Sequence, residues 1–256
     1  WTQYPGAIGP TTTYAHFFAD VDGDGKADWI RVARATNEAW IALGTGNGGF
    51  QFWQKWTSAV GAANNYNHFF VDVDGDSRAD WVQLSKTTDT VNVGLSTGAG
   101  NFQFWTKTIA SGVPGATWDS TFADITGDGR ADWLLVNKAN PSAMARVSVG
   151  DGSFGIDVSC GIQGTDTKFT FADINGDGLT DVIGVKPIGW GKTAFLALSK
   201  GDGTFAAPVE SGSSYGSDKY VDFSGQGMKS RFTSDPGSSG INPLIMRANG
   251  GDGYGG

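Results

Sequence analysis

Residues 18–30 read FADVDGDGKADWI, and the same pattern returns three more times along the chain. The copies are FVDVDGDSRADWV (70–82), FADITGDGRADWL (122–134) and FADINGDGLTDVI (171–183). Their first aspartates, at positions 20, 72, 124 and 173, lie 52, 52 and 49 residues apart. A fifth, degenerate copy, YVDFSGQGMKSRF, begins at residue 220. The chain is therefore built from repeats of about 50 residues.

A glycine turn that ends in an aromatic residue follows each copy of this Asp motif. Examples are GNGGF, which ends at Phe50, and GDGTF, which ends at Phe205. Such turns connect the two strands of a hairpin, and short alternating runs such as residues 91–95 lie between the motifs. We therefore expect four short antiparallel strands in each repeat, and an all-β fold made of β-propeller blades.

The two ends of the chain fit the register of the repeats. Trp53 and Trp105 each lie 19 residues before a first aspartate, and so does Trp1. If residue 256 were followed by residue 1, the closing interval between first aspartates would be 54 residues. The sequence thus predicts one propeller domain over residues 1–256, with five blades and an N-terminal segment that completes the last blade. A five-repeat piece of a larger propeller would show the same register.

The Asp motif places oxygen ligands at alternating positions, as a loop around a hard cation requires. Ca²⁺ takes six to eight oxygens, and the glycines between the acids let the chain wrap tightly. Asx-turns without metal are the alternative, but the grouped carboxylates would then repel one another. We predict about four structural Ca²⁺ ions, one in each intact Asp loop (20–28, 72–80, 124–132 and 173–181). The degenerate loop 222–230 keeps one of the four carboxylates and should be empty.

The predicted ligands are the side chains at places one, three, five and nine of each loop and the backbone carbonyl at place seven. They are Asp20, Asp22, Asp24, Lys26 and Asp28; Asp72, Asp74, Asp76, Arg78 and Asp80; Asp124, Thr126, Asp128, Arg130 and Asp132; and Asp173, Asn175, Asp177, Leu179 and Asp181.

The composition agrees with such loops and excludes several other classes of protein. Of the 26 acidic residues 24 are Asp, and the net charge of −8 argues against a nucleic-acid binder. Fourteen acids lie in the four intact loops, so four Ca²⁺ ions would bring the net charge close to zero. No apolar run is long enough to span a membrane. Cys160 is the only cysteine, which excludes an internal disulfide; we expect it to be buried. An Asp-rich, nearly cysteine-free β protein points to a secreted protein.

No set of residues in the sequence singles out a catalytic centre. His16 and His68 occupy equivalent places four residues before a first aspartate, which favours inner-strand positions over catalytic bases. His-Glu-x-x-His and phosphate-loop motifs are absent. A glycosidase acid pair would have to come from aspartates outside the motif: Asp89, Asp119, Asp166 or Asp218. We therefore predict no catalytic residue and do not favour an enzyme.

Aromatic and amide side chains gather in the connections expected on the face opposite the Asp loops. An aromatic ring stacks on the C–H groups of a sugar, while amides and carboxylates bind its hydroxyls. Packing between blades is the alternative role, and it is the one we expect for Trp29, Trp81 and Trp133. The candidate ligand-binding residues are Tyr14, Asn37, Tyr66, Asn67, Trp118, Asp119 and Trp190.

The Asp loop, preceded by Phe-Ala and followed by Trp-Ile, with GDGSF or GDGTF about 20 residues later, resembles the FG-GAP (VCBS) repeat. The resemblance implies calcium in loops on one face of a propeller, like those of integrin alpha heads and microbial lectins, and recognition on the opposite face. We expect a secreted, calcium-stabilised carbohydrate-binding or adhesion module that recognises a glycan or cell-surface polysaccharide. The alternatives are a polysaccharide lyase or hydrolase on the same scaffold, and a protein-interaction or structural propeller.

Overall fold

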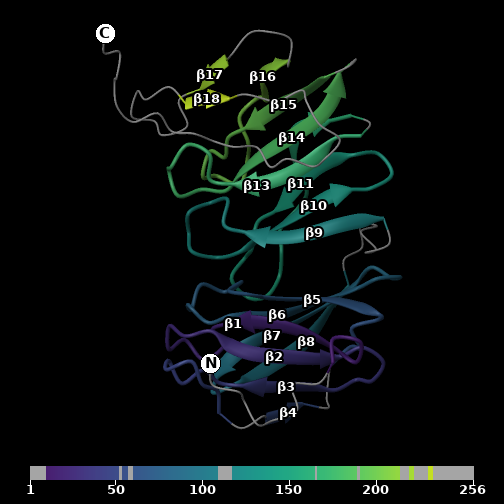
Figure 1. The fold of residues 1–256 in the computed structure, drawn as a ribbon, viewed down its shortest axis with the longest axis vertical. Helices are drawn as coiled ribbons and strands as arrows, with labels where there is room; N and C mark the ends of the chain where they lie inside the picture. The colour runs from purple at the N-terminus through teal and green to yellow at the C-terminus, as the bar shows by residue number, and fades with distance from the viewer. Residues whose placement is uncertain are drawn as a thin grey trace, which may run out of the picture. The chain divides into compact units, whose positions relative to one another are not determined.

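The computed structural model describes residues 10–51, 54–56, 60–108, 117–164, 166–188, 191–213, 219–221 and 230–232. These residues form strands β1–β18 and contain no helix, which confirms the all-β prediction (Figure 1). In particular, the described part of the chain has no helix of a length and apolarity suited to crossing a bilayer.

The first two repeats each form a four-stranded antiparallel sheet whose strands pair in chain order. The first sheet contains β1 (Tyr14–Ala19), β2 (Asp28–Ala33), β3 (Ala39–Ala42) and β4 (Gln54–Trp56). The second contains β5 (Tyr66–Val71), β6 (Asp80–Ser85), β7 (Thr90–Gly98) and β8 (Asn101–Thr108). The first Asp loop connects β1 to β2 and the second connects β5 to β6, so each lies between the first two strands of its blade.

The third and fourth repeats form sheets of the same order. The third contains β9 (Trp118–Ala123), β10 (Asp132–Asn137), β11 (Ser142–Arg146) and β12 (Val158–Gln163), and the fourth contains β13 (Lys168–Ala172), β14 (Asp181–Ile188), β15 (Gly191–Ala197) and β16 (Val209–Ser213). A two-stranded sheet of β17 (Lys219–Val221) and β18 (Ser230–Phe232) flanks the degenerate loop. The predicted four-stranded antiparallel blades are thus confirmed.

The chain divides into two compact units. In described residues, the first unit contains 10–122, 128–131 and 148–155, and the second contains 123–127, 132–147 and everything from 156 onward. The residues that would close a ring, including Trp1 and Tyr254, lie outside the described ranges. A single domain of five closed blades therefore stays a prediction.

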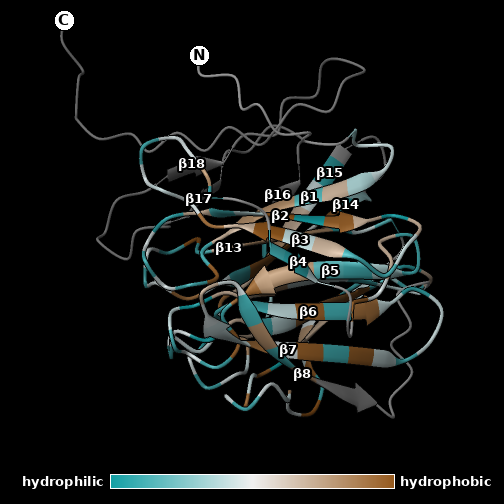
Figure 2. Cartoon of the chain, turned by 90° about the horizontal axis from the view of Figure 1, so that it is seen from below, coloured by the Kyte–Doolittle hydropathy of each residue, from teal (hydrophilic) through white to brown (hydrophobic). Residues whose placement is uncertain are grey.

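The core of the first unit lies between the first and second blades. Ile30 and Ile41 of the first blade are buried in one cluster with Trp81 and Phe102 of the second. In β7, hydrophobic and hydrophilic residues alternate, so the hydrophobic side chains lie on one face of the strand and can be buried in this core (Figure 2). Trp81 is fully buried, so its expected role in packing between blades is borne out in this unit.

A separate core fills the second unit. Ile125, Leu134 and Val182 are buried in it together with Cys160, as expected for that lone thiol. Trp133 is also buried in the second unit, whereas Trp29 of the first unit is only half-buried.

Candidate metal centre

The first aspartate of an Asp loop holds the loop together through backbone hydrogen bonds. In the first loop, Asp20 Oδ1 accepts from the N–H groups of Gly23 (2.7 Å) and Asp24 (3.2 Å), and Oδ2 accepts from Gly25 (2.7 Å). Both glycines have φ of +80°, a left-handed conformation that other residues rarely adopt. The glycines of the motif therefore let the backbone turn its N–H groups toward one carboxylate.

The last aspartate of the loop has a different role, because it fastens the loop to the third strand. Asp28 is fully buried, and its two oxygens accept from Val21 N (2.8 Å) and Gly44 N (2.7 Å). Asp80 is bonded in the same way to Val73 N (2.8 Å) and Ser96 N (2.7 Å). Each ninth-place carboxylate thus connects the start of its loop with the end of the third strand.

Burial shifts the protonation of these ninth-place carboxyls. Desolvation raises the pKa of Asp28 and Asp181, and it raises the pKa of Asp80 to about 7, although two backbone N–H donors oppose the shift in each case. A nearby cation would favour the ionised form of these groups and reverse the effect of burial.

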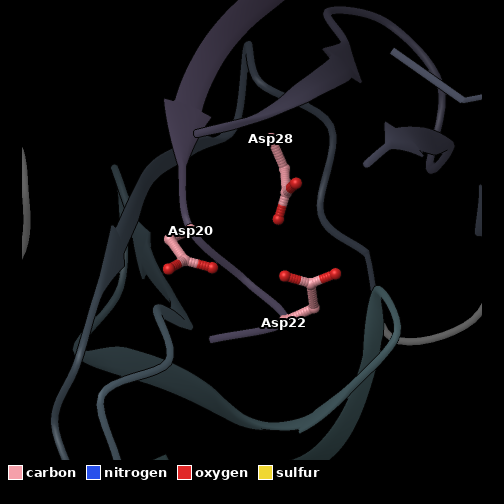
Figure 3. Close-up of side chains that lie close together, drawn as sticks. All are labelled: Asp20, Asp22 and Asp28. Carbon is pink, nitrogen blue, oxygen red and sulfur yellow. The ribbon is translucent and has the colours of Figure 1, made fainter. Parts of the chain in front are cut away.

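Three carboxylates converge in each of the first two loops. One oxygen each from Asp20, Asp22 and Asp28 lies within 4.8 Å of the others, and these side chains face a common space (Figure 3). Asp72, Asp74 and Asp80 form the corresponding triad of the second loop. Oxygens on opposite sides of a Ca²⁺ ion lie about 5 Å apart, so each triad has the dimensions and the all-oxygen donors of a calcium site.

The fifth-place acids lie outside these triads. Asp24 forms an ion pair with Lys26 Nζ, Asp76 with Arg78, and Asp128 with Arg130. The hydrogen bond from Lys26 lowers the pKa of Asp24. The sequence predicts only a backbone carbonyl ligand at the seventh place, whereas in the structure the side chain of this residue pairs with the fifth-place acid. The signal was available, since Lys or Arg follows the fifth-place acid by two residues in three loops.

The third and fourth loops keep the same backbone geometry with one carboxylate fewer. Gly127 N donates to Asp124 Oδ1 (2.6 Å), and Gly176 N donates to Asp173 Oδ1 (2.7 Å). At the third place, Asn175 donates to Asp177 Oδ2 (2.8 Å). Among the described residues, clusters of three acids occur in the first two loops alone. Residues 222–229 of the degenerate loop lie outside the described ranges.

The aromatic candidates on the opposite face begin the first strands of their blades. Tyr14, Tyr66 and Trp118 open β1, β5 and β9, and all three are half-buried. The Tyr14 ring packs against Arg31, whose guanidinium carbon lies 4.9 Å from the ring centroid. A methyl group at Gly61 would lie 2.2 Å from Tyr66 Cδ2, so that ring packs against the backbone. Both tyrosines therefore contribute to packing.

The polar candidates differ in exposure. Asn37 and Asp119 are exposed, and Asn67 is half-buried. Trp190 lies outside the described residues.

Hydrogen bonds join four connections of the first unit into one continuous surface. Arg34 N donates to Thr13 O (2.9 Å), Asn64 N donates to Arg34 O (2.9 Å), and Lys86 N donates to Asn65 O (2.9 Å). Apart from Pro10 and Ala35, the exposed residues that the structure describes on these connections are threonines and asparagines, and the charged residues Arg34, Glu38, Lys86 and Asp89 are half-buried. This surface, called the neutral ridge below, presents Thr11, Thr12, Thr13, Thr36, Asn37, Asn64, Asn65, Thr87 and Thr88.

The two histidines occupy equivalent places in the first and second blades. Trp29 Nε1 donates to His16 Nδ1 (3.1 Å), and Trp81 Nε1 donates to His68 Nδ1 (3.0 Å). Burial lowers the pKa of His68 to about 3, so its imidazole is neutral at ordinary pH. These inner-strand positions match the expectation that the histidines are structural.

Comparison with known proteins shows which family the repeats resemble. The model of the FG-GAP-like repeat family matches residues 20–83 and 72–135, and each match runs from one Asp loop into the next. Residues 20–135 are therefore similar to FG-GAP-like repeats. A search of curated proteins gave no match.

The fold is also similar to that of a solved lectin structure. An Agrocybe aegerita lectin that recognises non-reducing terminal N-acetylglucosamine is 22% identical, with a TM-score of 0.62 over 77% of this chain and 52% of the lectin. This chain thus spans about half the length of that lectin. The Photorhabdus luminescens Tc holotoxin pore is 20% identical, with a TM-score of 0.37 over 85% of this chain and 13% of the pore chain.

Proposed function

We propose that the protein is a secreted, calcium-stabilised β-propeller module that binds carbohydrate through the neutral ridge. The observation that carries the proposal is the chemistry of this ridge, whose most exposed polar side chains are hydroxyls and amides, whereas the charged residues on the same connections are half-buried. Such groups exchange hydrogen bonds with sugar hydroxyls, and a hydrogen-bonded backbone reduces the entropy lost when a ligand binds. Tyr14 and Tyr66 directly follow Thr13 and Asn65 of the ridge in the sequence, and both tyrosines are half-buried.

The donor set of the Asp loops supports calcium as the stabilising ion. Carboxylate oxygens converge in the two triads, and imidazole and thiolate ligands are absent from the four intact loops. Mg²⁺ retains several waters and requires strict octahedral geometry, so a compact protein cage suits Ca²⁺ better. Extracellular calcium modules bind in the range of about 10⁻⁴–10⁻³ M, which suits a protein that works outside the cell.

The lectin adds support for the ligand class. It has the same fold, and its recognition of N-acetylglucosamine shows that this architecture can present a sugar site. Because fold similarity does not carry function, the ridge itself provides the argument for this chain.

A glycan array probed with the full chain in millimolar calcium tests the carbohydrate proposal. We expect binding to at least one uncharged glycan, and we expect the Asn37→Ala/Asn64→Ala variant to bind it about tenfold more weakly, through the loss of two neutral hydrogen bonds. Asn140→Ala is the matched control, since Asn140 is an exposed asparagine on the β10–β11 connection of the third blade.

The array also separates the alternatives. Unchanged glycan affinity in the double variant would exclude the ridge as the carbohydrate-binding site. An array without hits would favour the alternative of a protein-interaction module. Cleavage of a bound polysaccharide would indicate an enzyme.

A further inference from the structure

We propose that Arg78, Ala79 and Ser96 of the second blade are positioning residues for the first Asp loop, and that they make metal binding at the first two loops positively cooperative. The inference rests on the proposed binding of calcium in these loops. It concerns two loops of the same compact unit.

Three contacts from the second blade hold the first loop in place. Ala79 N donates to the carbonyl of Asp20 (2.7 Å), and the Ser96 hydroxyl donates to the carbonyl of Val21 (2.5 Å). The Arg78 side chain covers Gly23, since a methyl group added at that glycine would lie 2.9 Å from Arg78 Cγ. The contacts therefore hold the beginning of the loop that gathers the first carboxylate triad.

The same three residues belong to the second loop. Ala79 directly precedes Asp80, and Ser96 N donates to Asp80 Oδ1 (2.7 Å). Arg78 pairs with Asp76 and donates from Nη2 to the carbonyl of Ser96 (3.4 Å). A cation held by the second triad therefore fixes Asp80, and with it the groups that hold the first loop.

The arrangement repeats along the chain, which argues that it is a property of the fold. Within the first unit, Ala131 N donates to Asp72 O (2.7 Å) and Ser148 Oγ donates to Val73 O (2.5 Å). Within the second unit, Ser199 Oγ donates to Ile125 O (2.6 Å). Each of these loops is thus held by groups from the next repeat, and the direction of the contacts is always the same.

These contacts lead to coupling because ordering one loop reduces the entropy that the next must lose on binding. Coupling is reciprocal, so each filled loop raises the affinity of the other by the same factor. We expect a factor of at least about five, the lower end of the usual range for coupled sites.

Calorimetric calcium titration of the full chain tests the proposal. Asp124→Asn and Asp173→Asn together silence the third and fourth loops, so that the first two are measured. We expect a Hill coefficient clearly above one in this background, and about fivefold weaker binding to the first loop when Asp72→Asn also silences the second.

Ser96→Ala provides the decisive variant, because it removes the hydroxyl and keeps the backbone N–H that Asp80 uses. We expect two calcium ions to bind with a Hill coefficient near one. The matched control is Ser199→Ala, which removes the equivalent contact between loops that are silent in this background and should leave cooperativity intact. The melting temperatures of both variants without calcium serve as a control, because similar values would show that a loss of stability does not cause the loss of cooperativity.

Two results would overturn the proposal. One is independent binding of two calcium ions in the unsubstituted background, and the other is undiminished cooperativity in Ser96→Ala; in either case calcium binding itself stands. If no calcium binds at all, both this inference and the proposed calcium sites are wrong.

Discussion

The buried imidazole of His68 predicts an acid-dependent loss of stability that one substitution should remove. His68 is 6% exposed and lies between the first two blades, with its ring centroid 6.2 Å from that of Phe17. Its Nδ1 accepts from Trp81 Nε1, so the proton resides on Nε2. Burial lowers its pKa from 6.5 to about 3. Protonation of this ring in the folded protein is therefore strongly disfavoured.

The direction of this pH dependence follows from proton binding in the folded and unfolded states. Between about pH 6.5 and 3, the unfolded chain binds a proton at this site and the folded protein does not, so acid favours unfolding. At pH 5, which is one and a half pH units below the pKa of His68 in the unfolded chain, the free energy of unfolding is lower by about 2 kcal/mol. Above pH 6.5 both states are neutral and the contribution vanishes. His68→Gln, which cannot titrate and can still accept from Trp81, should lack this loss.

Urea unfolding at several pH values, with calcium chelated, measures the difference between wild type and His68→Gln. The comparison is needed because the raised pKa of Asp80 has the opposite effect: in chelated protein, its protonation stabilises the fold as the pH falls below about 7. Both proteins contain Asp80, so its contribution cancels in the difference. A difference that stays flat from pH 7 to 5 would refute the claim that His68 is neutral and desolvated in the fold.

Three further predictions concern the loops and the packing of Tyr66. Chelation should lower the melting temperature. Calcium at about 100 times its dissociation constant should restore about 3 kcal/mol of folding stability per site, measured by calorimetry. A melting temperature that does not change on chelation would exclude structural calcium. Asp74→Asn should weaken calcium binding at the second loop, whereas Asp76→Asn should not, because Asp76 pairs with Arg78; equal weakening would show that both acids bind the ion. Gly61→Ala should destabilise the fold by about 1–3 kcal/mol in urea, since the new methyl group would overlap the Tyr66 ring; unchanged stability would mean that the ring relocates freely.

The sequence predicted the blades because their information is local. The Asp motif marks the end of one strand and the start of the next, as at Ala19 and Asp28, and the glycine turn marks the next hairpin. The turn preferences of one motif are weak, but they predict the hairpins reliably because the motif recurs at nearly the same interval. The grouping of Asp20, Asp22 and Asp28 followed from the same local pattern.

The contacts between loops could not be predicted in this way. Ser96 reaches the carbonyl of Val21 across 75 residues, and no short pattern in the sequence connects them. The neutral ridge likewise depends on how Arg34 bridges Thr13 and Asn64, which belong to separate connections. Such pairings depend on the way one blade packs against the next, and that depends on side-chain shape rather than on alternation alone.

The hydrogen bonds of the Asp loops bear on what calcium contributes to the fold. Asp20 and Asp28 together accept five backbone N–H bonds, and four of these bonds come from the wrapped path between Val21 and Gly25. The ninth-place carboxylates are also fully buried in all four intact loops, where strand pairing holds them. Calcium binding therefore does not have to order an extended segment, and it restricts only the remaining motion of a loop whose path the blades already shape. We accordingly expect the chelated protein to retain its β-sheet circular dichroism at room temperature while it melts earlier. Loss of the sheet signal on chelation would instead mean that the ions create the blades.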